Sequence, residues 1–222
     1  MSVKRSMTSF DLRVEVQELA PLIVGSRFQK AFDPVANALL IRLHRAGEGR
    51  VSLLTQLGRF VVATEQELKT PKTPGHFPAL LRKHLGNAPL TAIAQHGFDR
   101  VVTLSFGSEP TTDLVLELFG RGNMVLVRDG RILGVHHSET WKDRTLKGGS
   151  EYILPTSRSD PTAMDLAEFR ASLEGGVDSV RALALGANLG GTYAEEVCLR
   201  AGVDKTRTPG DLSEDETASL HA

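Results

Sequence analysis

The sequence contains a single cysteine, Cys198, in 222 residues, and it has no long apolar run. One cysteine excludes an internal disulfide and a cysteine metal cluster, which fits a reducing compartment. No segment approaches the roughly 20 consecutive apolar residues that a membrane helix needs. The N-terminal MSVKRSMTSF also lacks the apolar centre of a signal peptide. We therefore expect a globular cytoplasmic protein.

The motifs of several common enzyme classes are missing as well. The chain contains no nucleophile elbow, no P-loop and no dinucleotide-binding fingerprint. Gly120-Arg121-Gly122 lacks the third glycine of that fingerprint, and it lies between two expected strands instead of opening a helix. A hairpin turn explains this tripeptide better than a phosphate-binding loop does.

The net charge of -1 hides an uneven distribution of charge along the chain. Basic residues outnumber acidic residues in 1–160, and the reverse holds in 161–222. From Leu68 to Phe98 there is no acidic residue. Such a segment attracts phosphates, which position a nucleic acid without reading its sequence. The possible phosphate-binding residues are Lys69, Lys72, Arg82 and Lys83, and His76, His84 and His96 would add charge when protonated.

Two helices are expected in the first part of the chain. Apolar residues recur at helical spacing from residue 9 to about 20, and Thr8 and Asp11 have the spacing of a capping box. A second helix should begin at Pro78, after the proline-rich loop 69–78, and should end near Gly86. Its apolar stripe leaves Arg82 and Lys83 on the outer face.

Alternating apolar residues predict a series of strands with an antiparallel meander at its end. The strands are expected at 26–32, 38–44, 50–54, 60–64, 101–106, 113–119, 124–128 and 131–136. Asp129-Gly130 is a favoured hairpin turn between the last two. The polar segment 137–149, which contains the single Trp, is expected to be a loop.

After Pro161 the pattern becomes helical. Helices are expected at 166–173, 177–185 and 192–201, and the glycine-bearing connection 186–191 suggests a helix-hairpin-helix unit. Ser213 and Glu216 form a further capping box, but only six residues follow it. The expected organisation is a β-rich domain at 1–160 and a helical region at 161–222 that is truncated from a longer protein.

Three other groups of residues have simpler explanations than a functional one. His136, His137 and Glu139 include ligand types for a metal, but adjacent strand residues point to opposite faces. Cys198, between two apolar neighbours on a helix, fits a small core residue. Gly190 and Gly191 could offer backbone amides to a phosphate at a helix start, although the usual Gly-hydrophobic-Gly hairpin pattern is missing.

Asp11, Asp99 and Arg100 each have a structural and a functional interpretation. In the structural interpretation, Asp11 is a helix cap and nothing more, because the helix dipole favours an acidic residue in a first turn. Asp99 and Arg100 can be a turn residue and a solvated arginine. However, they follow the acid-free basic segment directly, and a carboxylate can accept hydrogen bonds from base amino groups. If Asp99 already lies in the strand, the two side chains point to opposite faces and do not pair.

Several stretches, in this order along nearly the whole chain, resemble the NFACT family of ribosome quality-control factors, once described as fibronectin-binding protein A-like. Each stretch is moderately specific, and their common order makes the resemblance strong. The N-terminal form is similar to the archaeal and eukaryotic branch. The matching stretches are MTSFDLRVEVQEL, FPALLRKHLGNAPLTAIAQHGFDRVVTLSF, ELFGRGNMVLVRDGRIL, DRTLKGGSEYILP and LGGTYAEEVCLRAGVD.

This resemblance implies an α+β NFACT-N domain that resembles the N-terminal domain of formamidopyrimidine-DNA glycosylases, followed by a helix-hairpin-helix region. In the family, a coiled coil and an RNA-binding NFACT-R domain come next. Family members bind the large ribosomal subunit with a stalled peptidyl-tRNA and recruit charged tRNA for untemplated C-terminal tailing. The resemblance assigns tRNA binding to Asp11, Asp99 and Arg100, with no cofactor, no metal and no catalytic residue.

The alternative function is that of a DNA glycosylase or abasic-site lyase, which the implied fold would allow. Those enzymes use an N-terminal proline followed by glutamate as nucleophile and acid. This chain begins Met-Ser-Val-Lys. The resemblance therefore implies the fold of these enzymes without their chemistry.

Overall fold

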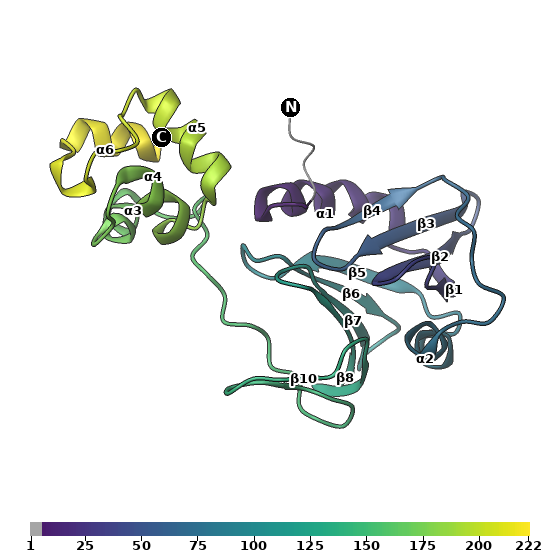
Figure 1. Cartoon of the computed structure of the whole chain (residues 1–222). Helices are drawn as coiled ribbons and strands as arrows, with labels where there is room; N and C mark the ends of the chain where they lie inside the picture. Colours follow the sequence, from purple (N-terminus) through teal and green to yellow (C-terminus); the bar gives the residue numbers. More distant parts are fainter. Residues whose placement is uncertain (1–5) are drawn as a thin grey trace. The chain divides into compact units, whose positions relative to one another are not determined.

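The computed structural model describes residues 6–222, so the Met-Ser-Val-Lys start on which the glycosylase alternative depends lies outside the described residues. The chain forms two compact units, one ending at Pro155 and the other spanning Thr156–Ala222. The first unit is built from antiparallel sheets with flanking helices, and the second is helical (Figure 1). The α+β class expected from the sequence is confirmed.

A four-stranded antiparallel sheet contains the strands in chain order: β1 (Arg27–Phe32), β2 (Ala38–Arg45), β3 (Gly49–Gln56) and β4 (Phe60–Thr64). All four were expected from the alternation of apolar residues. The register shifts between Phe28 and Lys30, where β1 has a bulge against β2. Because of this bulge, Phe28 and Ala31 both face the core although they lie three positions apart in the strand.

A second antiparallel sheet has five strands, also in chain order: β5 (Leu90–Gln95), β6 (Val101–Phe106), β7 (Thr112–Glu117), β8 (Asn123–Arg128) and β9 (Arg131–Val135). The predicted meander β6 to β9 is confirmed. Strand β5 was not predicted, because LTAIAQ has only two buried residues, Leu90 and Ile93, and they do not alternate. Gly120-Arg121-Gly122 is the turn between β7 and β8, as expected.

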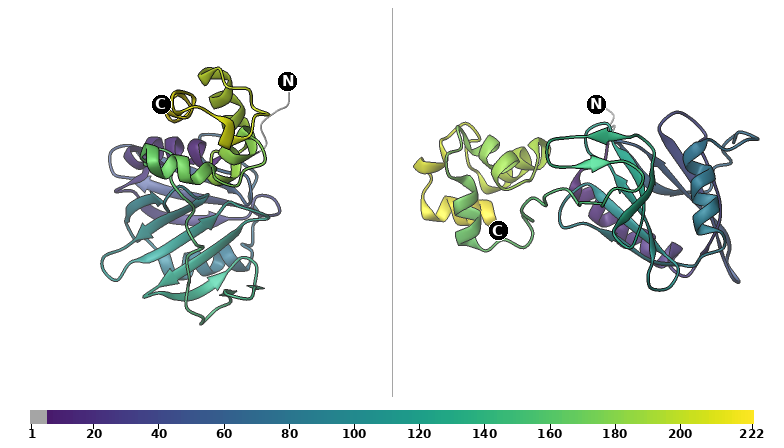
Figure 2. Two further views of the ribbon diagram at one scale, coloured as in Figure 1. Left: turned by 90° about the vertical axis from the view of Figure 1, so that its left-hand side faces the viewer. Right: turned by 90° about the horizontal axis from the view of Figure 1, so that it is seen from below.

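Two helices connect the edges of the sheets. Helix α1 (Ser9–Ile23) contacts the edge strands β4 and β5, and α2 (His76–Leu85) contacts β1 and β9. Helix α1 runs past the predicted end through Pro21, and α2 begins two residues before Pro78. Apolar residues of both helices and both sheets form one core. Figure 2 shows the ribbon of these helices and sheets from two further sides.

A buried ion pair fixes the segment that follows the meander. Glu117 at the end of β7 is 2% exposed, and it accepts hydrogen bonds from the guanidinium of Arg144 and, at 2.9 Å, from the hydroxyl of Tyr152. Burial and the adjacent Glu117 carboxylate raise the pKa of Tyr152, so it remains a donor. The predicted loop contains two short paired strands, β10 (Glu139–Thr140) and β11 (Thr145–Leu146).

The second unit has its own core of apolar side chains from its helices. Its elements are α3 (Leu166–Leu173), α4 (Ser179–Arg181), the π-helical turn η1 (Ala182–Gly186), α5 (Gly191–Ala201), the 3-10 turn η2 (Pro209–Asp211) and α6 (Glu214–His221). The predicted capping box at Ser213 and Glu216 is confirmed. Cys198 is 2% exposed and lies in this core, as expected. No helix in residues 6–222 is long and apolar enough to cross a membrane.

The buried ion pair leads to a prediction about stability. Replacing Arg144 by Met should lower the free energy of unfolding by about 3–5 kcal/mol, because Glu117 keeps its buried charge without its main partner. The double variant Glu117→Met with Arg144→Met should be less destabilised, since no uncompensated charge remains. Urea unfolding of the three proteins measures both values, and a double variant less stable than Arg144→Met would contradict this account.

Candidate nucleic-acid interface

The first turn of α1 holds Asp11 by a capping box. The Asp11 carboxylate accepts hydrogen bonds from the backbone N–H of Thr8 at 2.6 Å and from its hydroxyl at 2.7 Å. In return, the Thr8 hydroxyl accepts from the N–H of Asp11 at 3.2 Å. The capping interpretation is confirmed, and it fixes the orientation of a partly buried carboxylate at the start of the helix.

Asp99 and Arg100 lie in the turn between β5 and β6, immediately before the first residue of β6, as expected. The N–H of His96 donates to the carbonyl of Val101 at 2.9 Å, and the N–H of Asp99 donates to the carbonyl of His96 at 3.0 Å. Because Asp99 lies outside the strand, the argument that strand neighbours point to opposite faces does not apply to this pair. The carbonyl of Arg100 accepts from Leu118 at 2.7 Å and ties the turn to β7.

Phe98 anchors this turn under α1. Its side chain is fully buried, and its ring packs edge-on against Phe10 of α1 with 4.6 Å between the ring centroids. The guanidinium of Arg13, one helical turn further on, lies 4.7 Å from the same ring and donates to the carbonyl of Gly97 at 3.1 Å. Gly97 has φ of 52°, in the left-handed region that glycine adopts without strain.

Gln95 makes a second connection between the helix and the turn. Its side-chain amide donates to the carbonyl of Ser9 in α1 at 3.0 Å and to the carbonyl of Asp99 at 2.9 Å. The structure thus brings the first turn of α1, with Asp11, next to the turn that holds Asp99 and Arg100. We call residues 8–11 together with 96–100 the helix–turn site.

The sequence interpretation missed the residues that assemble this site. Phe10, Arg13, Gln95 and Phe98 have no recognisable motif of their own. One signal was available: an aromatic side chain after glycine in a polar turn needs an apolar partner from elsewhere in the chain. The identity of that partner depends on which element covers the turn.

The basic segment 68–98 is less uniform than its sequence suggests. Lys69, Lys72 and Lys83 are exposed. Arg82 was expected on the outer face of α2, but it is half-buried, and its Nε and Nη2 donate to the carbonyl of Ala31 at 3.0 and 2.7 Å. The expectation was wrong because a long side chain at the edge of an apolar stripe can reach the neighbouring strand.

The histidines of this segment differ from one another in their surroundings. Burial, with further contributions from Lys83 and Arg128, lowers the pKa of His84. A histidine with a lowered pKa stays neutral over more of the physiological pH range, so His84 adds little charge to the segment at pH 7. The exposed lysines and the half-buried Arg82 therefore carry the positive charge around α2.

The remaining candidate residues from the sequence belong to other segments than the helix–turn site. Gly190 is the N-cap residue of α5, where Gly191 is the first helical residue, and no side chain caps this end. His137 lies 3.1 Å from the amide oxygen of Asn37, and Glu139 pairs with Arg121. Within residues 6–222 no three His, Cys, Asp or Glu side chains are grouped to hold a metal ion.

Comparison with known proteins identifies the family. The family model described as NFACT N-terminal and middle domains matches residues 8–222. The archaeal Rqc2 homolog aRqcH of Methanocaldococcus jannaschii is 35% identical over 234 residues, which cover 98% of this chain and 34% of that protein. Human NEMF, named as a subunit of the ribosome quality control complex, is 34% identical over 125 residues, covering 56% of this chain and 12% of that protein.

Solved structures agree on the fold. The N-terminal part of the fibronectin/fibrinogen-binding protein from Streptococcus suis has a TM-score of 0.77 and 22% identity, and the match covers 98% of this chain and 85% of that chain. At this identity the likeness shows the fold alone. The chain spans well under half the length of aRqcH and NEMF. With the family model matched from residue 8 to residue 222, the chain belongs to the NFACT family.

Proposed function

We propose that this chain is the tRNA- and large-ribosomal-subunit-binding module of a ribosome quality-control factor. In this role it recruits charged tRNA for the untemplated C-terminal tailing of stalled nascent chains. The family and the printed names of its relatives, among them a ribosome quality control complex subunit, support the proposal. The protein acts in the cytoplasm, where ribosomes and tRNA are available.

The observation that carries this proposal is the helix–turn site. Two acidic groups and a guanidinium, from Asp11, Asp99 and Arg100, come from two segments that Phe98 and Gln95 hold against each other. A guanidinium donates to phosphates or to guanine edges, and a carboxylate accepts from base amino groups. A site held in place before binding loses little conformational entropy when RNA arrives.

Other residues of the chain supply contacts that do not depend on base sequence. Lys69, Lys72 and Lys83 are exposed and bind phosphates of the same tRNA. In the helical unit, Gly190 and Gly191 offer backbone N–H groups at the start of α5 to a further phosphate. In this proposal the helical unit is a helix-hairpin-helix region and the β-rich unit resembles the N-terminal domain of formamidopyrimidine-DNA glycosylases in its fold.

The proposed module breaks and forms no bonds of its own and uses no cofactor. Peptide bonds of the tail form in the peptidyl-transferase centre of the ribosome. The contribution of this chain is to hold a charged tRNA where the ribosome can use it. Positioning of this kind needs rigid recognition groups and no nucleophile.

Removal of one side chain tests the proposal. Arg100→Ala in the full-length protein should weaken tRNA binding about 10- to 150-fold, the equivalent of one charge-assisted hydrogen bond of about 1.5–3 kcal/mol. Its melting temperature should barely change, because the bond that ties the turn to β7 uses the carbonyl of Arg100, which alanine keeps. The measurements are tRNA co-purification, C-terminal tailing and thermal melting.

A matched control is Arg131→Ala, an exposed arginine on β9 in the other part of the meander. It should leave tRNA binding and melting unchanged. Strong destabilisation of Arg100→Ala with tRNA still bound would make Arg100 a structural residue and end this proposal.

The glycosylase alternative has a direct chemical test. A glycosylase-lyase forms a Schiff base with an abasic site, and borohydride reduces it to a stable covalent adduct. We expect no adduct when the protein is incubated with a DNA duplex that contains one abasic site, with a known bifunctional glycosylase as positive control. An adduct that depends on an amine of this chain would favour the alternative.

A further inference from the structure

The face of the β1–β4 sheet that points away from the core carries a row of basic side chains. Ala31 of β1, Ile41 of β2 and Leu53 of β3 face the core. The residues next to each of them in its own strand therefore point outward. Lys30 of β1 and Arg42 of β2 are direct neighbours in the register and therefore lie side by side on this outer face.

Phe32 lies on the same face and is covered by two arginines. It pairs with Leu40 in the register, and only 8% of it is exposed. The guanidinium carbons of Arg42 and Arg82 each lie 4.7 Å from the centre of its ring. One aromatic ring thus holds two cations from different elements, β2 and α2, in fixed positions.

Neither guanidinium group has an ion-pair partner among the described residues. Within residues 6–222, no carboxylate lies within ion-pair distance of Arg42 or Arg82, whereas Arg45, Arg50 and Arg144 each have one. Arg82 spends two N–H groups on the carbonyl of Ala31, which leaves three of its five donors for another acceptor. Neighbouring like charges repel, and a bound anion relieves this repulsion.

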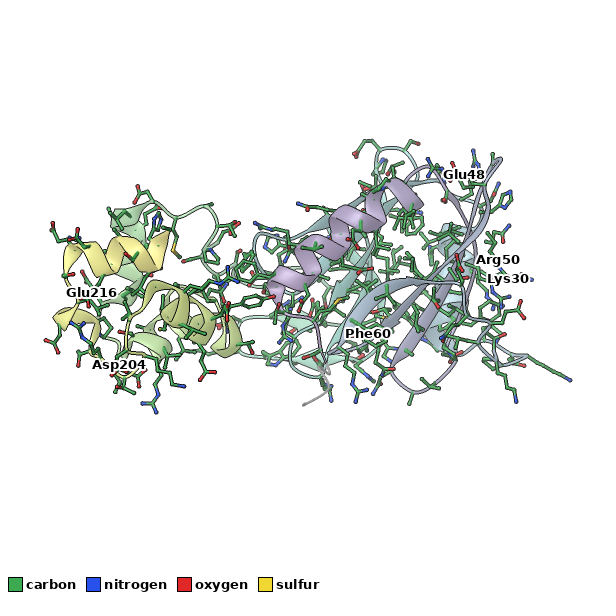
Figure 3. The ribbon with its side chains drawn as sticks, turned by 90° about the horizontal axis from the view of Figure 1, so that it is seen from above. Lys30, Glu48, Arg50, Phe60, Asp204 and Glu216 are labelled. Atoms are coloured by element: carbon green, nitrogen blue, oxygen red, sulfur yellow. The ribbon has the colours of Figure 1, made fainter. Side chains whose placement is uncertain are left out.

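The row of basic side chains continues from β2 to β3 and is therefore longer than a single small anion. Arg50 of β3 lies two residues from Ser52, which is the register neighbour of Arg42. Arg50 has an exposed ion pair with Glu67 at 3.5 Å, and such pairs contribute little and exchange readily for a stronger partner. Figure 3 shows Lys30 and Arg50 at the same side of the first unit. Arg42 and Arg50 also line an open hollow of about 530 Å³, which Glu65 and Glu67 line as well.

We propose that this basic sheet face, formed by Lys30, Arg42, Arg50 and Arg82, binds the sugar-phosphate backbone of RNA. The proposal rests on the proposed RNA-binding function and adds a second contact surface to the helix–turn site. Planar guanidinium groups match the geometry of phosphate oxygens, and an open row of cations fits a chain of phosphates better than a single one. The contact positions RNA without reading its bases.

The test measures how RNA affinity depends on salt in Lys30→Gln with Arg42→Gln, a variant that leaves the structural Arg82 in place. The probes are labelled tRNA and a labelled 20-nucleotide oligouridylate, each followed by fluorescence anisotropy across a range of NaCl concentrations. Loss of two phosphate contacts should lower the log–log slope by roughly 1.4–1.8. At about 0.1 M salt this corresponds to a fall in affinity of roughly 25- to 60-fold.

Two further variants control for folding and for net charge. Lys30→Gln alone changes a side chain that is exposed at the sheet edge, and it should lower the slope by roughly 0.7–0.9 even if the double variant proves unstable. Arg131→Gln removes one positive charge from the exposed end of β9 and should leave the slope unchanged. If Arg131→Gln lowered the salt slope as much as Lys30→Gln does, the effect would be one of general charge, and the proposal would be overturned.

The two probes separate this inference from the proposed function. If the unmodified protein binds both RNAs and the Lys30 and Arg42 variants have the same affinity and salt slope, the inference is wrong and the proposed function stands. If it binds oligouridylate but not tRNA, and the variants lower the slope, the inference stands and the tRNA function fails. If it binds neither RNA, both are wrong.

Discussion

The burial of Phe98 beneath α1 is the contact on which the helix–turn site depends. The ring lies between Phe10 and Arg13, and it holds a turn whose other residues are polar. Removing a buried aromatic side chain from a packed site costs about 3–5 kcal/mol, more than the surface contacts of the turn could replace. The same contact brings the carboxylate of Asp11 and the Asp99-Arg100 pair onto adjoining segments, so stability and recognition share one interaction.

Arginines in this protein have different roles because their partners differ. Arg144 is paired with the buried Glu117 and lies over the ring of Tyr152, so its charge is used within the fold. Arg42 and Arg82 stack on Phe32, and no described carboxylate lies within ion-pair distance of either guanidinium. A residue type alone therefore does not separate a structural cation from one that can bind a phosphate.

The sequence predicted the elements with strong periodicity well and the isolated ones less well. The β6–β9 meander and the Thr8–Asp11 capping box followed from local patterns, since alternation and cap spacing are properties of neighbouring residues. Strand β5 was missed, because its two buried residues lie three apart and its pairing partner is β6. Arg82 was expected to be exposed on α2 but is half-buried, because the carbonyl of Ala31 that it contacts lies on another element.

The sequence by itself determined the family resemblance, the α+β class and the identity of Asp11, Asp99 and Arg100 as candidates. The tertiary structure alone decided that Gln95 and Phe98 join these candidates, and that Arg42 and Arg82 share one ring. The physical reason is that caps, turns and alternation involve residues close in the chain, whereas Gln95 to Ser9, Phe98 to Phe10 and Arg82 to Phe32 join residues 50 or more positions apart. Such contacts exist only once the helices and sheets have packed.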